Sequence, residues 1–381
     1  MEVARLFCVV VIVSLARTAF CGDGEFAVRD LGTLGGSMSW ARAINNSHEV
    51  VGDSTVDASG ETHAFIWTYR DGMHDLGTLG GTFSAAGLIN DAGHVVGEST
   101  TSTESRRAFQ WTRAEGMHDL GTLGGDSVSL SAINAAGDIV GASQTADGST
   151  HAFLWAPRLG MRDLGSLGSG FSSAIGVSDS GLVVGASMIS VGGATHAFLW
   201  SRDSGMVDLG TLGGTNSVAL SVDTQGLVVG ESETSSGVRR AFLWTRRTGM
   251  VELGPEDPFT QSYASMINSR GQVAGRVGLT TFVWTKKSGM VDLGSLAVYS
   301  RPTDINQRGH IVGEFGPTDG AKFAAFVWTR TTGMVALESF SSGSRGSAIN
   351  EHDTVAGQSA MPTGEWHAVI WERHSQDHES E

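Results

Sequence analysis

The chain has 381 residues, of which 40% are hydrophobic and 17% charged, with 53 glycines and a formal net charge of −15 at pH 7. This composition is not that of a disordered chain, so we expect a buried core. The acidic charge is poorly matched to nucleic-acid phosphates or to an anionic membrane surface, which excludes nucleic acid as an expected partner.

The first 21 residues predict a secretory signal peptide. They carry one net positive charge and the apolar run LFCVVVIVSLA, and a short segment with small residues precedes Gly22, which is the order typical of such signals. The run is too short to span a bilayer permanently, so we expect no integral membrane span in the mature protein. Lipidation of Cys21 is an alternative, although Phe20 stands where that motif prefers a small residue. Removal of the signal would take away both cysteines, Cys8 and Cys21, and would leave a mature chain without disulfides.

A repeat of roughly 44 residues extends from residue 26 to residue 371, and such a period indicates a solenoid, a propeller or an array. The phrase DLGTLGG stands at 30–36, 75–81, 119–125 and 208–214. Its first residue or the equivalent falls at Asp30, Asp75, Asp119, Asp163, Asp208, Glu252, Asp292 and Ala336. A tryptophan keeps the same register at Trp67, Trp111, Trp155, Trp200, Trp244, Trp284, Trp328 and Trp371. There are therefore eight repeats, and we expect the Trp column to lie in the core between them.

Each repeat predicts four antiparallel strands. In residues 150–165, HAFLW leads through a short loop to Gly160 and then into MRDLG, which indicates a hairpin. In residues 127–143, SAIN turns at Asn134 into DIVGAS, where the Asn side chain caps the turn and Gly137 closes it. The small residues of the SxAxxIN segment predict that it is the innermost strand, followed outward by VVGxS, HAFLW and MxDLG.

The chain ends decide between a rod and a closed architecture. The chain opens with FAVRDLG (26–32) and no HAFLW strand before it, and it closes with HAVIW (367–371) and no DLG strand after it. A solenoid needs polar caps at both ends, whereas a propeller hides its edges when the first strand pairs with the last unit. We therefore predict an all-β fold, an eight-bladed β-propeller closed by pairing the N-terminal strand with the last blade. It would form a single domain over residues 22–373, followed by a polar, disordered tail at 374–381.

The repeated phrases resemble a known family. HAFLWTxxxGMxDLGTLGG and INxxGxVVGxS are similar to the HAF-repeat family of extracellular repeat proteins, whose His-Ala-Phe signature stands here at residues 63–65, 151–153 and 196–198. The resemblance covers residues 26–371. The strand order is also similar to that of WD repeats, although the Trp-Asp pair is missing. The resemblance implies a secreted, extracellular protein, with the periplasm as an alternative, and it brings no catalytic residues.

The recurring polar positions do not predict a catalytic or metal site. The Asp column is better suited to accepting local backbone N–H groups than to forming a set of ligands. The His of HAF is replaced in other repeats by Arg107, Arg240, Thr280 and Ala324. The position after VVG is partly acidic, but ligands spread around a wide structure do not converge on a metal. No GxSxG, HExxH or phosphate-binding loop is present, so we predict neither a metal nor a cofactor.

Departures from the repeat cluster in the last third of the chain, where five of the six prolines lie. If the outer-to-inner connections and the VVGxS-to-HAF loops emerge on one face, these residues border a single rim. Aromatic faces and hydrogen-bonding groups there suit a sugar or a peptide. The predicted ligand-binding residues are Glu256, Asp257, Phe259, Tyr263, Tyr299 and Arg301. The alternative is that redundant repeats have simply drifted.

The function that follows is a secreted, monomeric, non-enzymatic repeat protein that binds a carbohydrate or protein ligand. The alternative is an exported propeller enzyme, a hydrolase or lyase acting on a polysaccharide, with a pocket at the propeller axis. Glycoside chemistry needs two carboxylates in one pocket, and the sequence does not place such a pair.

Overall fold

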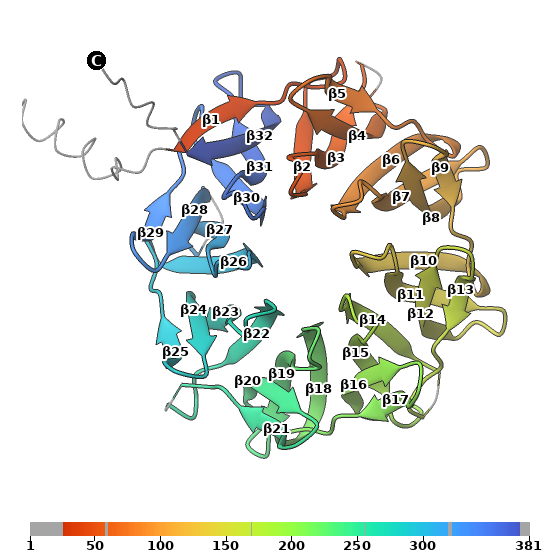
Figure 1. Cartoon of the computed structure of the whole chain (residues 1–381), viewed down its shortest axis with the longest axis vertical. Coiled ribbons are helices and arrows are strands. Elements are labelled where there is room, and N and C mark those ends of the chain that lie inside the picture. Colours follow the sequence, from red (N-terminus) through yellow and green to blue (C-terminus); the bar gives the residue numbers. More distant parts are fainter. Residues whose placement is uncertain (1–25, 58–59, 169, 256, 319–321, 374–381) are drawn as a thin grey trace, which may run out of the picture.

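The computed structural model describes residues 26–57, 60–168, 170–255, 257–318 and 322–373. The predicted signal at 1–21 and the tail at 374–381 lie outside the described residues. The described part consists of thirty-two β-strands joined by turns and loops. No helix in it is long and apolar enough to cross a membrane. Figure 1 shows the strands grouped radially about a central opening.

The first four repeats follow one another along the chain. Their strands are β2 (Ser39–Ile44), β3 (Val50–Thr55), β4 (Thr62–Thr68) and β5 (Gly72–Asp75) in repeat 1; β6 (Gly80–Ile89), β7 (Val95–Thr101), β8 (Arg106–Thr112) and β9 (Gly116–Asp119) in repeat 2; β10 (Gly124–Ile133), β11 (Ile139–Thr145), β12 (Thr150–Ala156) and β13 (Gly160–Asp163) in repeat 3; and β14 (Ser172–Val177), β15 (Val183–Met188), β16 (Thr195–Ser201) and β17 (Gly205–Asp208) in repeat 4.

The last four repeats have the same plan, and the final one takes a strand from each end of the chain. Their strands are β18 (Gly213–Val222), β19 (Val228–Thr234), β20 (Arg239–Thr245) and β21 (Gly249–Glu252) in repeat 5; β22 (Ser262–Ile267), β23 (Val273–Val277), β24 (Thr280–Thr285) and β25 (Gly289–Asp292) in repeat 6; β26 (Tyr299–Ile305), β27 (Ile311–Gly316), β28 (Ala324–Thr329) and β29 (Gly333–Ala336) in repeat 7; and β30 (Ser344–Ile349), β31 (Val355–Ala360) and β32 (Trp366–Arg373) with β1 (Phe26–Asp30) in repeat 8.

The strand order within a repeat matches the sequence-based prediction. In repeat 3, for example, β10, β11, β12 and β13 are hydrogen-bonded in that order, and β10 lies nearest the central opening (Figure 1). In repeat 8 the order is β30, β31, β32 and β1. β1 pairs antiparallel with β32 from Phe26↔Arg373 to Asp30↔Val369. The predicted pairing of the N-terminal strand with the last repeat is thus confirmed.

The predicted fold class, an eight-bladed propeller, is nevertheless wrong as stated, because the strands form seven hydrogen-bonded sheets. Six have four strands, while repeats 1 and 2 share one eight-stranded sheet in which Thr62 of β4 forms a parallel bridge with Phe83 of β6. No ladder among the described strands joins the sheets into a closed ring. The physical reason is that neighbouring repeats pack face to face through their side chains, and packed sheets lie about 10 Å apart. The backbone hydrogen bonds between repeats are isolated ones at the loops, such as Ser300 N to Leu279 O and Ser344 N to Phe323 O, and they do not extend into ladders.

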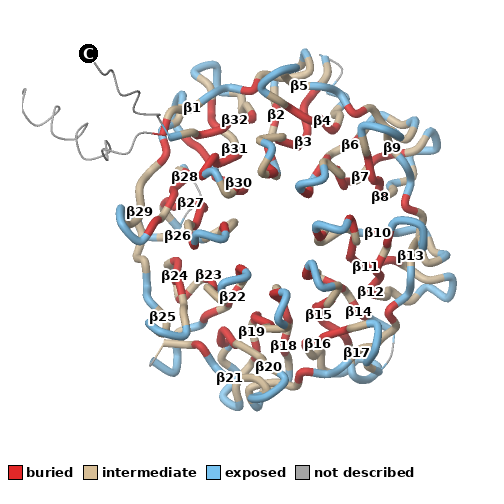
Figure 2. The backbone as a smooth tube through the Cα atoms, in the orientation of Figure 1, coloured by how far each residue is buried: buried red, intermediate tan, exposed pale blue. Residues whose placement is uncertain are grey.

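The core consists of clusters that lie between neighbouring repeats. One cluster combines Val51 and Ala64 of repeat 1 with Val95 and Phe109 of repeat 2. Another combines Phe65 of repeat 1 with residues of repeat 8, so that the two ends of the chain pack together. Figure 2 shows that buried residues concentrate within the sheets and that exposed ones lie mainly at the turns.

A phenylalanine column is the most deeply buried part of this core. Seven repeats place the Phe of HAF, or its equivalent, at full burial: Phe65, Phe109, Phe153, Phe198, Phe242, Phe282 and Phe326. The Trp column was expected to fill this role, but only some of its members are buried. Trp371 is fully buried and Trp200 nearly so, whereas Trp155 and Trp244 are partly exposed. The Trp follows the Phe by two residues on the same face of the strand, and it lies nearer the outer hairpin.

The Asn turns that join the two inner strands also contact one another. As predicted, the Asn side chain caps its own turn; Asn90 Oδ1, for example, accepts hydrogen bonds from the backbone N–H groups of Ala92 (3.1 Å) and His94 (3.0 Å). Its Nδ2 donates to the carbonyl of Asn134 in the next repeat (3.0 Å). The further donations of this kind are Asn45 to Asn90, Asn134 to Ser178, Asn268 to Asn306, Asn306 to Asn350 and Asn350 to Asn45. These bonds link the innermost turns of neighbouring repeats, including repeats 8 and 1.

Candidate functional site

Two sets of loops emerge on one face, as the sequence predicted, and we call it the loop face. They are the connections from an outer strand to the next inner strand and the loops between the second and third strands. In repeat 2, Leu79 of the first connection donates its N–H to Ser99 Oγ at 2.9 Å, next to the second loop. Leu79 also forms an isolated bridge with Thr101. The same arrangement holds Leu34 against Ser54 at 2.9 Å.

Histidine and aspartate side chains form a repeated pair on the loop face. In four repeats the imidazole Nδ1 lies 2.8–3.1 Å from the carboxylate of the Asp that begins the DLG phrase. The pairs are His63–Asp75, His151–Asp163, His196–Asp208 and His367–Asp30. The carboxylates also accept local backbone donors, as in the 2.7 Å bond from Gly77 N to Asp75 Oδ1. The Asp column therefore serves local structure.

The paired positions differ in the other repeats. Two repeats replace the imidazole by a guanidinium, in the pairs Arg240–Glu252 at 2.7 Å and Arg107–Asp119 at 3.8 Å. Repeat 7 has Ala324 and Ala336 at the two positions. The strand pairing shows this equivalence: Ala324 is the first residue of β28, and Ala336, the last residue of β29, pairs with Phe326. Repeat 7 therefore lacks both side chains of the pair.

The acidic position after VVG is occupied by ion pairs rather than by a metal-binding cluster. Asp53 Oδ1 lies 2.9 Å from Arg42 Nε, and Glu98 Oε2 lies 2.9 Å from Arg106 Nη1. Within the described ranges, no group of three or more His, Cys, Asp or Glu side chains is arranged to hold a metal ion.

A continuous stack of arginine and aromatic side chains crosses repeats 6 to 8, and we call it the Arg–aromatic cluster. The Arg276 guanidinium lies over the rings of Tyr263 (5.0 Å) and Tyr299 (5.3 Å), and its Nη1 donates to the Tyr299 hydroxyl at 3.1 Å. Tyr299 meets Phe323 edge to face with ring centroids 6.0 Å apart. The guanidinium of Arg345 then lies over Phe323 at 5.6 Å. It also lies over Trp366 at 6.0 Å, which completes the cluster.

Electrostatics and burial hold this cluster in place. Glu314 is buried, and its carboxylate lies 2.8 Å from Arg301 Nε and 3.7 Å from Arg345 Nε. One acid thereby orients two exposed guanidinium groups. Burial raises the pKa of Tyr263, an effect that the nearby Arg276 opposes. The Nε of Arg276 is a buried donor for which the described residues offer no acceptor, so stacking, rather than this nitrogen, fixes the guanidinium.

The structure brings some of the predicted ligand-binding residues together and leaves others apart. Tyr263 and Tyr299 both contact Arg276, and Arg301 belongs to the same region through Glu314. Asp257 accepts hydrogen bonds from Phe259 N and Thr260 Oγ1 within its own loop. The Thr260 bond is the main reason why the pKa of Asp257 is lowered. Glu256 lies outside the described residues. Ligand binding by these residues stays a prediction.

Exposed apolar side chains extend the site along three adjoining loops. Phe259 is 81% exposed, and Leu279, Leu296 and Val298 are each about half exposed. The loops are tied to their neighbours by Gly278 N to Gln261 O at 2.8 Å and Ser300 N to Leu279 O at 2.8 Å. Large apolar side chains exposed together on one face mark interaction surfaces in soluble proteins.

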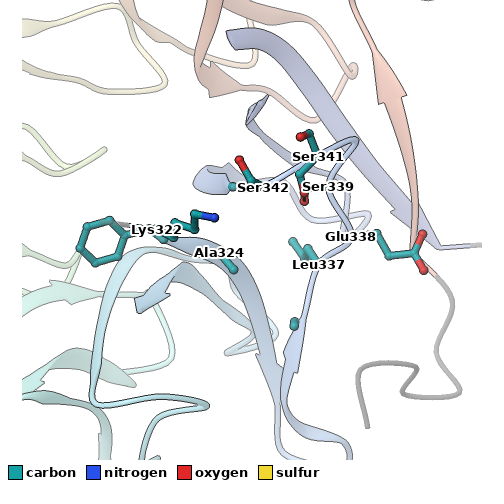
Figure 3. A pocket seen from close by; sticks show the side chains of 10 residues that line it. Lys322, Ala324, Leu337, Glu338, Ser339, Ser341 and Ser342 are labelled. Carbon is teal, nitrogen blue, oxygen red and sulfur yellow. Dashed lines mark hydrogen bonds between the residues drawn. The ribbon is translucent and has the colours of Figure 1, made fainter. Parts of the chain in front are cut away.

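A pocket of about 410 Å³ opens beside the cluster in repeats 7 and 8, and we call it the Lys322 pocket. Its apolar lining includes Phe323, Ala324, Ala336 and Leu337, and its polar lining includes Lys322, Glu338, Ser339, Ser341 and Ser342. Figure 3 shows the Lys322 amine directed towards the loop that carries Ser339 and Ser342, while the Glu338 carboxylate points away from it. The two alanines are those that replace the His–Asp pair.

A second pocket of about 310 Å³ is formed by residues of the inner strands β2, β6 and β10 together with β3 and β7. Asp53 and Glu98 both line it, so the structure does place two carboxylates in one pocket, which the sequence could not do. Burial raises the pKa of Asp53, and the Arg42 ion pair opposes this effect.

Sequence reasoning missed Arg276, Lys322, Phe323, Arg345 and Trp366 as site residues. Two signals were present. Trp366 is one of only two tryptophans outside the Trp column, and Arg276 is a cation at a position that is acidic in four other repeats. Neither signal shows that the two side chains belong to one cluster, because Trp366 and Arg276 lie in different repeats.

The known proteins to which this chain is similar indicate a propeller-like fold and no function. No protein-family model matches the chain, and no curated protein sequence matches it. Among solved structures, the chain is similar to dipeptidyl peptidase 4 of Porphyromonas gingivalis, with a TM-score of 0.56 and 8% identity over 87% of this chain and 57% of that one. It is also similar to a catalytically inactive virginiamycin B lyase of Staphylococcus aureus with quinupristin, with a TM-score of 0.50 and 10% identity over 92% and 100%. A puromycin hydrolase mutant gives a TM-score of 0.50 and 14% identity over 90% and 59%.

These neighbours are β-propeller proteins, so the chain has a propeller-like arrangement of β-sheets. The chain spans less than two thirds of the peptidase and of the puromycin hydrolase. Identities of 8–14% carry the fold and no activity.

Proposed function

We propose that this protein is a non-catalytic binding module that takes up an acidic carbohydrate along the loop face of repeats 6 to 8. The observation that carries the proposal is the Arg–aromatic cluster, in which Arg276 is stacked between two tyrosines and Arg345 lies over Phe323 and Trp366. In the regular phrases of repeats 2 to 5, Val, Ser and Ala occupy the position of Tyr263. The arginine–aromatic contacts described there are single pairs, Arg106 over Phe83 and Arg162 over Trp200.

The chemistry of the cluster matches that of an acidic sugar. The C–H faces of a sugar ring are apolar and pack against aromatic side chains, while tyrosine and tryptophan keep a polar group for hydrogen bonding. A guanidinium binds a carboxylate through two parallel hydrogen bonds. Aromatic and arginine side chains that alternate over three repeats would therefore contact successive sugars of an extended chain.

The proposed ligand is extracellular. The resemblance to HAF repeats and the predicted signal at residues 1–21 support export, which would expose the loop face to extracellular polysaccharide. A protein ligand is the other candidate for the same surface, because aromatic and arginine anchors are typical of protein interfaces too. The guanidinium groups that flank Glu314 favour a ligand with negative charge.

The enzymatic alternative would use the pocket that contains Asp53 and Glu98. Two carboxylates in one pocket are the feature that favours a hydrolase or lyase. Each of them, however, is neutralised by an arginine at 2.9 Å. Binding therefore explains more of the structure than catalysis does.

Polysaccharide binding tests the proposal. Isothermal titration with polygalacturonate should show binding, and its methyl-esterified, uncharged form should bind at least about tenfold more weakly, because esterification removes the carboxylates that the guanidinium groups recognise. The double variant Tyr263→Ala/Tyr299→Ala should lose at least about tenfold in affinity, or about 1.4 kcal/mol, with little change in melting temperature.

The matched control changes the regular loops instead. Thr78→Ala/Thr122→Ala alters two connections on the same face in repeats 1 to 3 and should leave the affinity intact. Equal binding by both double variants, or a larger effect of the threonines, would contradict the proposal. Release of new reducing ends from the polysaccharide would favour the enzymatic alternative.

A further inference from the structure

The pocket beside Lys322 occupies a place that other repeats fill. In repeats 1, 3, 4 and 8 an imidazole and a carboxylate meet there, and in repeats 2 and 5 a guanidinium takes the place of the imidazole. Repeat 7 has a methyl group at both positions, Ala324 and Ala336, and both line the pocket of about 410 Å³. The cavity is therefore a local consequence of losing one specific pair of side chains.

The walls of this pocket are fixed by hydrogen bonds. Leu337 N donates to Ala325 O at 2.8 Å, and Ser344 N donates to Phe323 O at 3.0 Å. The indole Nε1 of Trp371, a fully buried residue, donates to Glu338 O at 2.6 Å. The cavity is thus formed before any ligand arrives, and its volume falls within the range of about 300–1,000 Å³ that is usual for small-molecule sites.

The polar groups of the pocket select for negative charge. Lys322 contributes an ammonium group, and Ser341 and Ser342 contribute hydroxyls that can donate hydrogen bonds. The Ser339 hydroxyl already donates to Ser341 O at 2.8 Å. Among the described lining residues there is one carboxylate, that of Glu338, and it points away from the amine (Figure 3). In addition, the guanidinium of Arg345 lies over the outer wall residue Phe323 at 5.6 Å.

We propose that the Lys322 pocket binds a monosaccharide-sized carboxylate, namely a sugar acid. Its carboxylate would pair with the Lys322 ammonium and the hydroxyls of Ser341 and Ser342, and its ring would pack on Ala324, Leu337 and Phe323. The inference deepens the proposed function and rests on it for the choice of a sugar. Because Phe323 belongs both to the pocket and to the Arg–aromatic cluster, a terminal sugar acid would enter the pocket while the preceding sugars lie along the cluster.

Titration of the full chain with free galacturonate tests the pocket by itself. Galacturonate should bind, while galactose, which lacks the carboxylate, should bind at least about tenfold more weakly. Lys322→Gln should weaken galacturonate binding at least about tenfold. Lys286→Gln is the matched control, because Lys286 is exposed in the hairpin between β24 and β25, and it should bind galacturonate as the parent does.

A second variant refills the pocket. Ala324→His/Ala336→Asp restores the pair that four other repeats contain, so the protein should fold normally, keep its melting temperature and lose galacturonate binding. Retained binding in this folded variant would overturn the proposal, as would equal affinities for galactose and galacturonate or the absence of galacturonate binding. Binding of inorganic phosphate without binding of galacturonate would show a simple anion site and would overturn the assignment to a sugar acid.

Binding at the Lys322 pocket and binding at the Arg–aromatic cluster can be measured separately. Tyr263→Ala/Tyr299→Ala should still bind free galacturonate, since neither tyrosine lines the pocket. Loss of monosaccharide binding in the refilled variant, with no polysaccharide binding by the parent, would refute the cluster proposal alone. Polysaccharide binding that depends on the tyrosines, without any galacturonate binding, would refute the pocket alone.

Discussion

A single carboxyl group, Asp304 of β26, links repeats 7 and 8. Its Oδ2 accepts a hydrogen bond from Ile349 N of β30 at 3.0 Å, and its Oδ1 accepts one from Ile305 N at 2.8 Å. Desolvation raises the pKa of this group to about 6, against the opposing effect of the two hydrogen bonds. In repeat 5 the equivalent residue is Ser221, whose hydroxyl lies 3.4 Å from Ile267 N.

Asp304 should make the folding stability depend on pH. The folded state holds the proton more tightly than the unfolded state, whose pKa is near the ordinary value of 3.8. This group therefore favours folding most at low pH and loses that contribution as the pH rises from about 4 to about 6, by roughly 2–3 kcal/mol at most. Urea unfolding at several pH values would measure this loss.

The control for Asp304 is Asp304→Ser, which keeps an acceptor and removes the titration. The difference in unfolding free energy between parent and variant should shift in favour of the variant between pH 4 and pH 6. A difference that is constant with pH would show that the carboxyl group titrates normally. The unfolding free energy of the variant must be subtracted from that of the parent because Asp353 changes stability with pH in the opposite direction. Burial raises the pKa of Asp353, but the hydrogen bonds from His310 and Asn306 outweigh burial, so its pKa lies below the ordinary value.

At the scale of the element, the glycine of VVG shows how two strands fit together. In repeat 3 the inner strand β10 has a bulge between Leu130 and Ala132, opposite Gly141 of β11. A Cβ on Gly141 would lie 1.9 Å from Ser129 O and 3.0 Å from Phe153 Cε1. The Ser129 carbonyl and the buried Phe153 ring thus occupy the space that any side chain would need.

Substitution at this position should be costly. Gly141→Ala forces the two strands apart, and we expect a loss of at least about 2–3 kcal/mol in unfolding free energy, measured by urea denaturation. Gly87→Ala is the control, since Gly87 lies in the inner strand β6 and a Cβ there would meet nothing within 4 Å. The control should change stability by less than about 1 kcal/mol. Equal effects of the two substitutions would mean that the Ser129 carbonyl does not approach Gly141 closely.

At the scale of the whole molecule, β1 decides how the two ends of the chain meet. It forms a five-residue ladder with β32, and it brings Phe26 and Leu31 into two core clusters. Asp30 also accepts a hydrogen bond from His367 across the same junction at 3.0 Å. Without β1, β32 would present an open edge to other molecules.

Deletion of residues 22–32 should therefore cause aggregation or a large fall in melting temperature, measured by light scattering and calorimetry. A synthetic peptide of residues 26–32 added in excess should restore part of the lost stability, because it can refill the edge and the two apolar sites. A truncated protein that melts like the parent would show that β1 contributes nothing to the junction of repeats 8 and 1.

The features that the sequence predicts correctly are those within a single repeat. Local patterns predict the period, the four strands of a repeat and their order from the centre outward, because hairpins form between neighbouring segments and each turn residue acts through its own backbone. The pairing of the chain ends is a long-range contact, and it was predictable because the two ends each carry the part of a repeat that the other lacks. The HAFLW phrase contains both the Phe and the Trp, and the sequence predicts the Trp column, rather than the Phe column, as the core between repeats. Alternation along a strand puts both on one face, and only the packing of the next repeat decides which of them is fully covered.

The sequence by itself determined the repeat, the strands and the irregular sector in which Tyr263, Tyr299 and Arg301 lie. The tertiary structure alone decided the grouping into seven sheets, since a single bridge between Thr62 and Phe83 merges two repeats. It also decided the contents of the candidate site. Arg276, Phe323 and Arg345 belong to three different repeats, and their contact depends on how neighbouring sheets pack. The Lys322 pocket is visible in the sequence only as two alanines, because a cavity is defined by the side chains that surround it.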